Sequence, residues 1–178
     1  MSSLSPLGVP GVALVTGGGS GIGRATSLLL AKEGVRALTI ADINNAHGET
    51  VKAEAEKTAT NPDFKCIVLA TDVTDHEAVQ VMVAETVKAF GRLDYAVNCA
   101  GIGFKRPFND TAISDWQRVI NINLTAVFSC VNVEANQMIK QTPLQSERYI
   151  EQAFPYSTND RLTFDVSVPL SLSSLVPS

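Results

Sequence analysis

The residues best suited to chemistry form a glycine-rich segment near the start of the chain, TGGGSGIG over residues 16–23. The segment follows an apolar run typical of a strand and precedes an apolar pattern typical of a helix. Glycines at such a junction let the backbone approach a ligand closely, and the first N–H groups of the helix attract negative charge. The spacing is Thr-Gly-x-x-x-Gly-x-Gly rather than G-x-G-x-x-G. We therefore expect the pyrophosphate of a dinucleotide to bind at Gly17, Ser20, Gly21, Ile22 and Gly23.

The alternative for this segment is a glycine-rich turn that binds nothing, which its position between strand and helix disfavours. A second residue supports the binding interpretation. Asp42 follows Gly23 by 19 residues, close to the spacing of about 20 at which an acid accepts hydrogen bonds from the adenosine ribose. A carboxylate there repels a 2′-phosphate, and neither Ser20 nor Ile43 is a base that could hold one. Asp42 thus favours NAD over NADP as cofactor; a solvated aspartate at a strand end is the alternative.

Four short apolar runs predict the strands that would position these residues. Such runs are typical of strands buried on both faces of a parallel sheet. The runs are Val12–Thr16, Ala37–Ala41, Cys66–Ala70 and Leu93–Val97.

Helical patterns lie between and after these runs. The first begins after the glycines and ends at Gly34, and a more polar one covers residues 45–59. Thr74-x-x-Glu77 resembles a capping box for a third helix, which Gly91 would end. Ser114-x-x-Gln117 opens a fourth, which runs to about Ile139 with an apolar stripe. The stripe consists of Ile120, Leu124, Val127, Phe128 and Val131. This alternation predicts an α/β fold with a parallel sheet, right-handed crossovers and helices on both faces.

Composition narrows the setting of the protein. The net charge of −4 argues against nucleic acid and anionic membranes as partners. No apolar run approaches the ~20 residues that span a bilayer, and residues 1–6 lack the pattern of a signal peptide. Three cysteines without metal-ligand spacing favour a reduced, cytoplasmic setting and predict no metal site.

Four motifs in order resemble the classical short-chain dehydrogenase/reductase family over about residues 11–140. The first is the glycine pattern of residues 16–23. The others are Asp72-Val73 after the third predicted strand, Asn98-Cys99-Ala100-Gly101 after the fourth, and Asn121-Ile122-Asn123-Leu124 in the last helix. The family usually has asparagine where this chain has Cys99. The resemblance implies a Rossmann-like fold with strand order 3-2-1-4.

The resemblance also implies roles for individual residues. Asp72 would accept from the adenine amino group beside the Val73 backbone, and Asn98 would stabilise the sheet near the cofactor. Ala100 and Gly101 would line the ribose, and Asn123 would hold a water in a proton relay. Local bonding is the alternative for both Asp72 and Asn123.

The family's activity is hydride transfer between NAD or NADP and an alcohol or carbonyl substrate. Its catalytic Tyr-x-x-x-Lys occurs nowhere in this sequence. We therefore expect this chain alone to be inactive and a small-molecule substrate to bind only in a full-length form. The alternative is a non-catalytic nucleotide-binding remnant or an interaction protein. The family pairs through the helix at Ser114 and a neighbour that is absent here, so the oligomeric state is left open.

The composition changes after Lys140, since no lysine follows it. We expect residues 1–140 to form an incomplete dinucleotide-binding domain and residues 141–178 to form a tail outside the family. Alternating apolar residues predict one edge strand in that tail, over residues 162–168, and disorder elsewhere.

Overall fold

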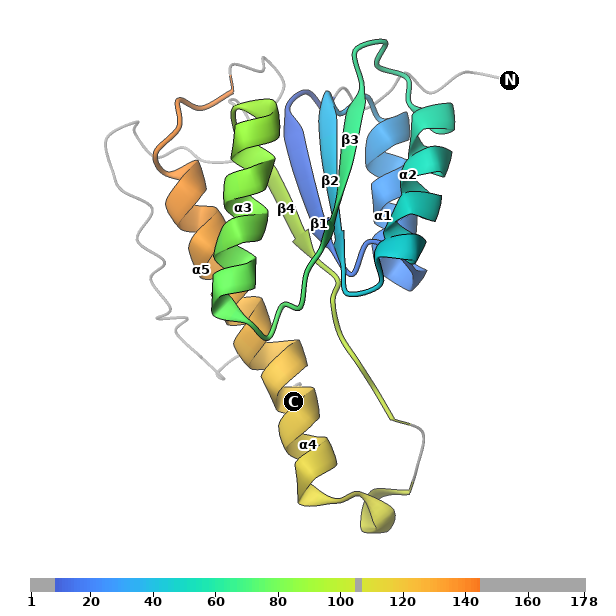
Figure 1. The fold of residues 1–178 in the computed structure, drawn as a ribbon, viewed down its shortest axis with the longest axis vertical. Coiled ribbons are helices and arrows are strands. Elements are labelled where there is room, and N and C mark those ends of the chain that lie inside the picture. The colour runs from blue at the N-terminus through green and yellow to red at the C-terminus, as the bar shows by residue number, and fades with distance from the viewer. Residues whose placement is uncertain (1–8, 105–106, 145–178) are drawn as a thin grey trace, which may run out of the picture. The chain divides into compact units, whose positions relative to one another are not determined.

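The computed structural model describes residues 9–104 and 107–144. Its centre is a parallel sheet in the order β3-β2-β1-β4, as predicted (Figure 1). Apart from residues 141–144, the predicted tail and its strand at 162–168 lie outside the described residues. The strands are β1 (Val12–Thr16), β2 (Ala37–Asp42), β3 (Lys65–Ala70) and β4 (Tyr95–Asn98).

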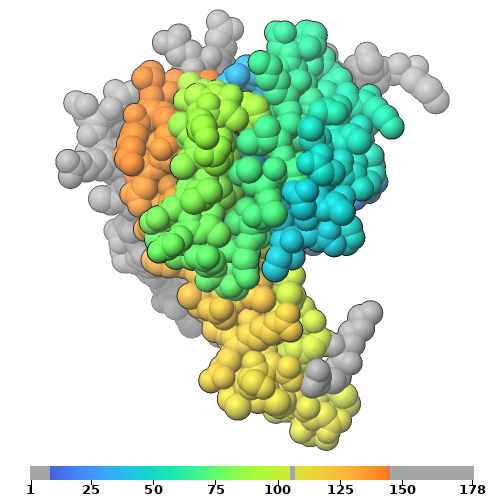
Figure 2. Space-filling view, viewed as in Figure 1, coloured from blue at the N-terminus to red at the C-terminus, as the bar shows by residue number. Residues whose placement is uncertain are grey.

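Helices cover both faces of the sheet, again as predicted. On one face lie α1 (Gly21–Lys32) and α2 (Asn45–Thr58), and on the other α3 (His76–Phe90) and α5 (Val127–Met138) (Figure 1). Three shorter elements connect β4 to α5: the 3-10 helix η1 (Phe108–Asp110), α4 (Ile113–Ile120) and the π-helix η2 (Asn121–Ala126). In Figure 2, α4 (yellow) projects away from the helices that cover the sheet, and none of its residues is buried.

The sheet is the core because β1 and β2 are buried along their whole length. Successive strand residues point to opposite faces. Ala13 and Val15 therefore pack in the cluster that includes residues of α1 and α2, whereas Leu14 packs with residues of α3 and with Cys130 of α5. An unbroken apolar run without alternation is the sequence pattern that such a strand requires.

Two predicted helix starts were wrong by one or two residues. The N-cap of α3 is Asp75, whose side chain accepts from the N–H groups of Glu77 and Ala78, so Thr74 forms no capping box. The Thr74 hydroxyl instead donates to Asp72. Helix α4 begins at Ile113 after Ala112, so Ser114 lies inside the helix. The predicted helix ends at Gly34 and Gly91 fit the left-handed backbone at both glycines.

The predicted apolar stripe of the last helix does not form its buried face. Leu124, Phe128 and Val131 are exposed, whereas the buried residues of this region are Ala126, Cys130 and Glu134. The stripe therefore marks the helix but not its buried face, which consists of small residues and one carboxylate.

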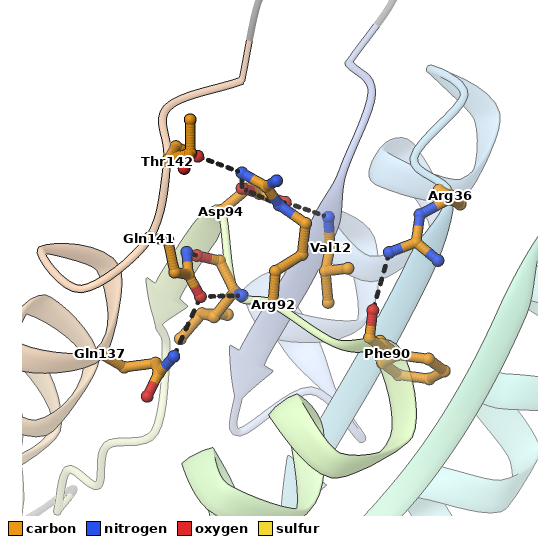
Figure 3. A network of polar contacts seen from close by, with 9 residues as sticks. Val12, Arg36, Phe90, Arg92, Asp94, Gln137, Gln141 and Thr142 are labelled. Carbon is orange, nitrogen blue, oxygen red and sulfur yellow. Dashed lines mark hydrogen bonds and ion pairs between the residues drawn. The ribbon is translucent and has the colours of Figure 1, made fainter.

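At the end of the sheet where the strands begin, one glutamine joins α5 to β4. The Gln141 side chain accepts from the N–H of Leu93 at 2.8 Å and donates to the carbonyl of Leu93 at 2.6 Å. Gln137 supports it by donating to the Gln141 oxygen. Beside them, Asp94 accepts from the N–H of Val12 and from Arg92 (Figure 3). Gln141 thus pairs with Leu93 as a residue of a neighbouring strand would.

Replacing Gln141 tests this link. Gln141→Leu keeps the size of the side chain but leaves the N–H and C=O of Leu93 without this partner. We expect the free energy of unfolding to fall by about 2 kcal/mol, measured by urea denaturation. Gln117→Leu, on the exposed α4, is the matched control and should change it by less than about 0.5 kcal/mol. Equal effects of both substitutions would contradict the prediction.

Candidate functional site

A cleft of about 560 Å³ opens where the four strands end. Loops after β1, β2, β3 and β4 form its walls together with α4 and η2. The structure brings together every predicted cofactor residue except Asn98, which lies behind the wall. The predicted residues that line the cleft are Gly17, Ser20, Gly21, Ile22, Gly23, Asp42, Asp72, Val73, Ala100 and Gly101.

The glycine loop is packed too closely to carry side chains at two positions. A Cβ on Gly23 would collide with the carbonyl oxygen of Gly17. A Cβ on Gly17 would lie 2.7 Å from the Cα of Ala100, and Gly17 has a φ of +62°. These glycines let the start of α1 pack against the end of β1, and let the β1 loop touch the β4 loop.

The first turn of α1 is suited to an anion. Ser20 is its N-cap residue, but the Ser20 side chain makes no capping hydrogen bond, and no acidic residue lies in the first turn. The N–H of Arg24 bonds to the carbonyl of Ser20, and the N–H groups before it have no intrahelical partner. A pyrophosphate can accept from these donors at the positive end of the helix dipole.

Asp42 connects the glycine loop to the second strand. Its Oδ2 accepts from the N–H of Gly19 at 2.9 Å and its Oδ1 from the N–H of Asn44 at 2.8 Å. These bonds fix the carboxylate at the cleft wall. A carboxylate has about four acceptor sites, so Asp42 retains sites for the hydroxyls of a ribose.

Asp72 is the exposed carboxylate at the end of β3. Its Oδ1 accepts from the Thr74 hydroxyl at 2.7 Å and from the Thr74 N–H at 2.9 Å. These two hydrogen bonds lower the pKa of Asp72, so it is ionised at neutral pH. Local bonding, the alternative to a cofactor role, is therefore present, although Asp72 also lines the cleft.

Asn98 belongs to a polar chain behind the cleft. The Thr16 hydroxyl donates to its Oδ1 at 3.1 Å, and its Nδ2 donates to Oε2 of Glu134 at 2.8 Å. Glu134 is 2% exposed. Burial raises the pKa of its carboxyl, and the hydrogen bond from Asn98 partly offsets this.

Asn123 lies in the π-helix η2, an element that is often found at functional sites. Its Oδ1 accepts from the N–H of Ile102 and its Nδ2 donates to the carbonyl of Ile102, both at 2.9 Å. The side chain therefore fixes the β4 loop to the helix. Its role in a proton relay stays a prediction.

Sequence reasoning missed six residues that line the cleft and one that lies behind it. Ile43 and Thr71 follow strand ends, so their position could have identified them. Arg118 and Ile122 lie on helical turns whose facing side depends on the tertiary fold. No sequence signal marks the buried Glu134. The missed lining residues are Ile43, Thr71, Cys99, Ile102, Arg118 and Ile122.

The cysteines and possible metal ligands of the described residues form neither a disulfide nor a ligand cluster. Cys66, Cys99 and Cys130 are free, and burial raises the pKa of Cys66 and Cys130 to about 12. Within residues 9–104 and 107–144, no three His, Cys, Asp or Glu side chains lie together as metal ligands would. None of the helices described is long and apolar enough to cross a membrane.

Comparison with known proteins gives consistent matches over this region. The family described as short chain dehydrogenase matches residues 11–143. Short-chain dehydrogenase anuF of Penicillium roqueforti is 40% identical over 134 residues, which cover 74% of this chain and 49% of the relative. Short chain dehydrogenase/reductase astE of Aspergillus oryzae is 41% identical over 131 residues, or 73% of this chain and 49% of the relative.

A crystal structure of NAD+-bound xylitol dehydrogenase has a TM-score of 0.67 and 36% identity to this chain. The match covers 72% of this chain and 48% of that protein. The chain thus spans about half the length of the relatives that it matches.

Two glycine substitutions test the packing of the loop. Gly23→Ala should lower the free energy of unfolding by about 3 kcal/mol, because its Cβ would meet backbone that cannot move aside. Gly21→Ala is the control: unlike Gly23, Gly21 has a positive φ, but a Cβ there would meet no atom within 4 Å. It should cost only about 1 kcal/mol of backbone strain. Equal losses of unfolding free energy in the two variants, measured by urea denaturation, would contradict the packing argument.

Glu134 should make stability depend on pH. Because its pKa is raised from 4.5 in the folded chain, the folded state keeps a proton that the unfolded chain releases. Its contribution to stability is present below pH 4.5 and is lost as pH rises through the folded pKa. The difference in unfolding free energy between wild type and Glu134→Gln, which does not titrate, should therefore change in that window.

Urea unfolding at a series of pH values measures this difference. The lowered pKa of Asp72 acts in a separate window, below 3.8, where stability falls as the pH falls. Parallel pH profiles for wild type and Glu134→Gln would show that Glu134 does not titrate differently on folding.

Proposed function

The chain belongs to the short-chain dehydrogenase family, and we propose that it provides the dinucleotide-binding part of an NAD-dependent oxidoreductase. The reaction would transfer a hydride between the nicotinamide and an alcohol or carbonyl substrate. The observation that carries the proposal is the cleft at the strand ends. The glycine loop, the start of α1 without a side-chain cap, and the Asp42 carboxylate all line this cleft. Open α/β sheets bind ligands at this edge.

The residues present fit such a cofactor. The start of α1, over residues 20–23, would hold the pyrophosphate, and Asp42 would accept from the adenosine ribose. Ile43 is 75% exposed and lines the cleft with Val73 and Asp72, which suits an apolar adenine face beside an acceptor for its amino group. Ala100 and Gly101 would line the second ribose. The cofactor itself would supply the hydride chemistry.

Asp42 favours NAD over NADP. Its carboxylate lies at the cleft wall and repels a 2′-phosphate, and its neighbour Ile43 offers no positive charge. Arg118 also lines the cleft, but from α4 rather than from the loop after β2. The similarity to an NAD+-bound dehydrogenase supports a nicotinamide dinucleotide in general.

The three free cysteines fit a cytoplasmic setting.

We further propose that the 178-residue chain binds the cofactor without turning over substrate. Family members use a tyrosine as the proton donor or acceptor, with a lysine four residues later. No Tyr-x-x-x-Lys occurs in this sequence, and Tyr95 lies within β4. The same observation favours a non-catalytic nucleotide-binding protein as the second candidate function. Residues 1–140 would be the binding domain in both cases.

Calorimetric titration with NAD+ and NADP+ tests the choice of cofactor. We expect wild type to bind NAD+ at least about tenfold more tightly, a difference of about 1.4 kcal/mol. Asp42→Asn keeps an acceptor but removes the charge, so it should narrow this preference. Asp63→Asn, at an exposed turn, should leave the preference unchanged. Equal affinities for both cofactors in wild type would contradict the assignment.

Absorbance of the reduced nicotinamide tests turnover. The purified chain with NAD+ and simple alcohols should form no NADH above the rate without protein. Sustained NADH formation would overturn the proposal that the chain binds without catalysis.

A further inference from the structure

We propose that Glu134 is a positioning residue for dinucleotide binding. It orients the Asn98 amide, which bonds to Thr16 and so helps to hold the glycine loop against the loop after β4. Glu134 does not line the cleft and no motif predicts it. The inference rests on the proposed dinucleotide binding, which it deepens by naming a residue on α5 that shapes the cleft from behind.

The burial of Glu134 is unusual for a carboxylate. Its side chain is 2% exposed, its Oε2 accepts from Asn98, and its Oε1 has no hydrogen-bond partner among the residues described. A buried polar atom without a hydrogen-bond partner costs free energy. The carboxylate therefore contributes little to stability by itself, and among the described residues Asn98 is its one hydrogen-bond partner.

That contact determines which way the Asn98 amide points. A carboxylate oxygen accepts, so the Nδ2 end of Asn98 must face Glu134 and the Oδ1 end must face Thr16. If the amide turned over, Oδ1 would lie against the carboxylate and the two oxygens would repel each other. Through this orientation, Asn98 presents its Oδ1 to the Thr16 hydroxyl as an acceptor at 3.1 Å.

Thr16 carries this constraint into the cleft. Its only hydroxyl proton goes to Asn98, so its oxygen is free to accept from the N–H of Ala100, 3.4 Å away. Its carbonyl accepts from the N–H of Cys99 at 3.1 Å. Cys99 and Ala100 line the cleft, and Gly17 follows Thr16 in the facing loop. The chain from Glu134 to Asn98 to Thr16 therefore fixes the β4 loop against the glycine loop.

Three substitutions separate positioning from packing. Glu134→Leu removes the acceptor at similar size, Glu134→Gln retains an acceptor, and Cys130→Ala changes a buried side chain one turn earlier on α5. By calorimetry, we expect Glu134→Leu to weaken NAD+ and ADP-ribose binding about tenfold, a change of about 1.4 kcal/mol. Glu134→Gln should restore affinity to within about threefold, and Cys130→Ala should leave it within about twofold.

A double-mutant cycle and an experiment without ligand complete the test. In an Asn98→Ala background, Glu134→Leu should have no further effect on affinity, because the two residues act through one bond. In the unliganded chain, Glu134→Leu should speed amide hydrogen exchange at Ala100, and Glu134→Gln should not.

The outcomes distinguish the two proposals. If wild type binds neither NAD+ nor ADP-ribose, the proposed function fails, and exchange at Ala100 still tests the role of Glu134. If wild type binds but Glu134→Leu keeps its affinity and its Ala100 exchange rate, the positioning role is wrong. Equal losses in Glu134→Leu and Glu134→Gln would also overturn it, since an acceptor would then not be what matters.

Discussion

The rest of the structure depends on a backbone contact at the end of β1. Helix α1 can start against the strand it follows only because Gly23 has no side chain to collide with the carbonyl of Gly17. The same loop passes close to Ala100 after β4 and bonds to Asp42 at the end of β2. With order β3-β2-β1-β4, β1 is the strand at which both neighbouring loops meet. A ligand site at this edge follows from that geometry and from the uncapped helix dipole.

The polar chain from Glu134 to Thr16 adds a second constraint, from the other face of the sheet. Apolar packing holds α5 against the sheet through Cys130, but it does not set how the loops at the strand ends are oriented. Hydrogen bonds have direction, so Asn98 and Thr16 can transmit the position of α5 to the cleft. At the opposite end of the sheet, Gln141 fixes the same helical region to Leu93. The segment from Glu134 to Gln141 thus bonds to Asn98 at the end of β4 and to Leu93 just before its start.

The sequence predicted the fold where one local rule dominates. Continuous apolar runs predicted all four strands, and glycines marked the ends of α1 and α3. Most of the cleft residues were predictable because they lie in the segments that follow the strands. Prediction failed where tertiary packing chooses among similar local options. Asp75 rather than Thr74 caps α3, and no sequence pattern marked Glu134 as a buried residue of α5. Arg118 and Glu134 could not be placed because helical periodicity does not say which face meets the cleft.

The most direct test of the account is amide hydrogen exchange of the chain with and without saturating NAD+. If the cleft binds the dinucleotide, protection should rise at residues 17–23, at residues 42–43 and at residues 99–102, which line it from three loops. Exchange at residues 51–58 of α2, none of which lines the cleft, should change little. Unchanged exchange in all three loops at a concentration where NAD+ binding is measured would place the cofactor elsewhere and contradict the account.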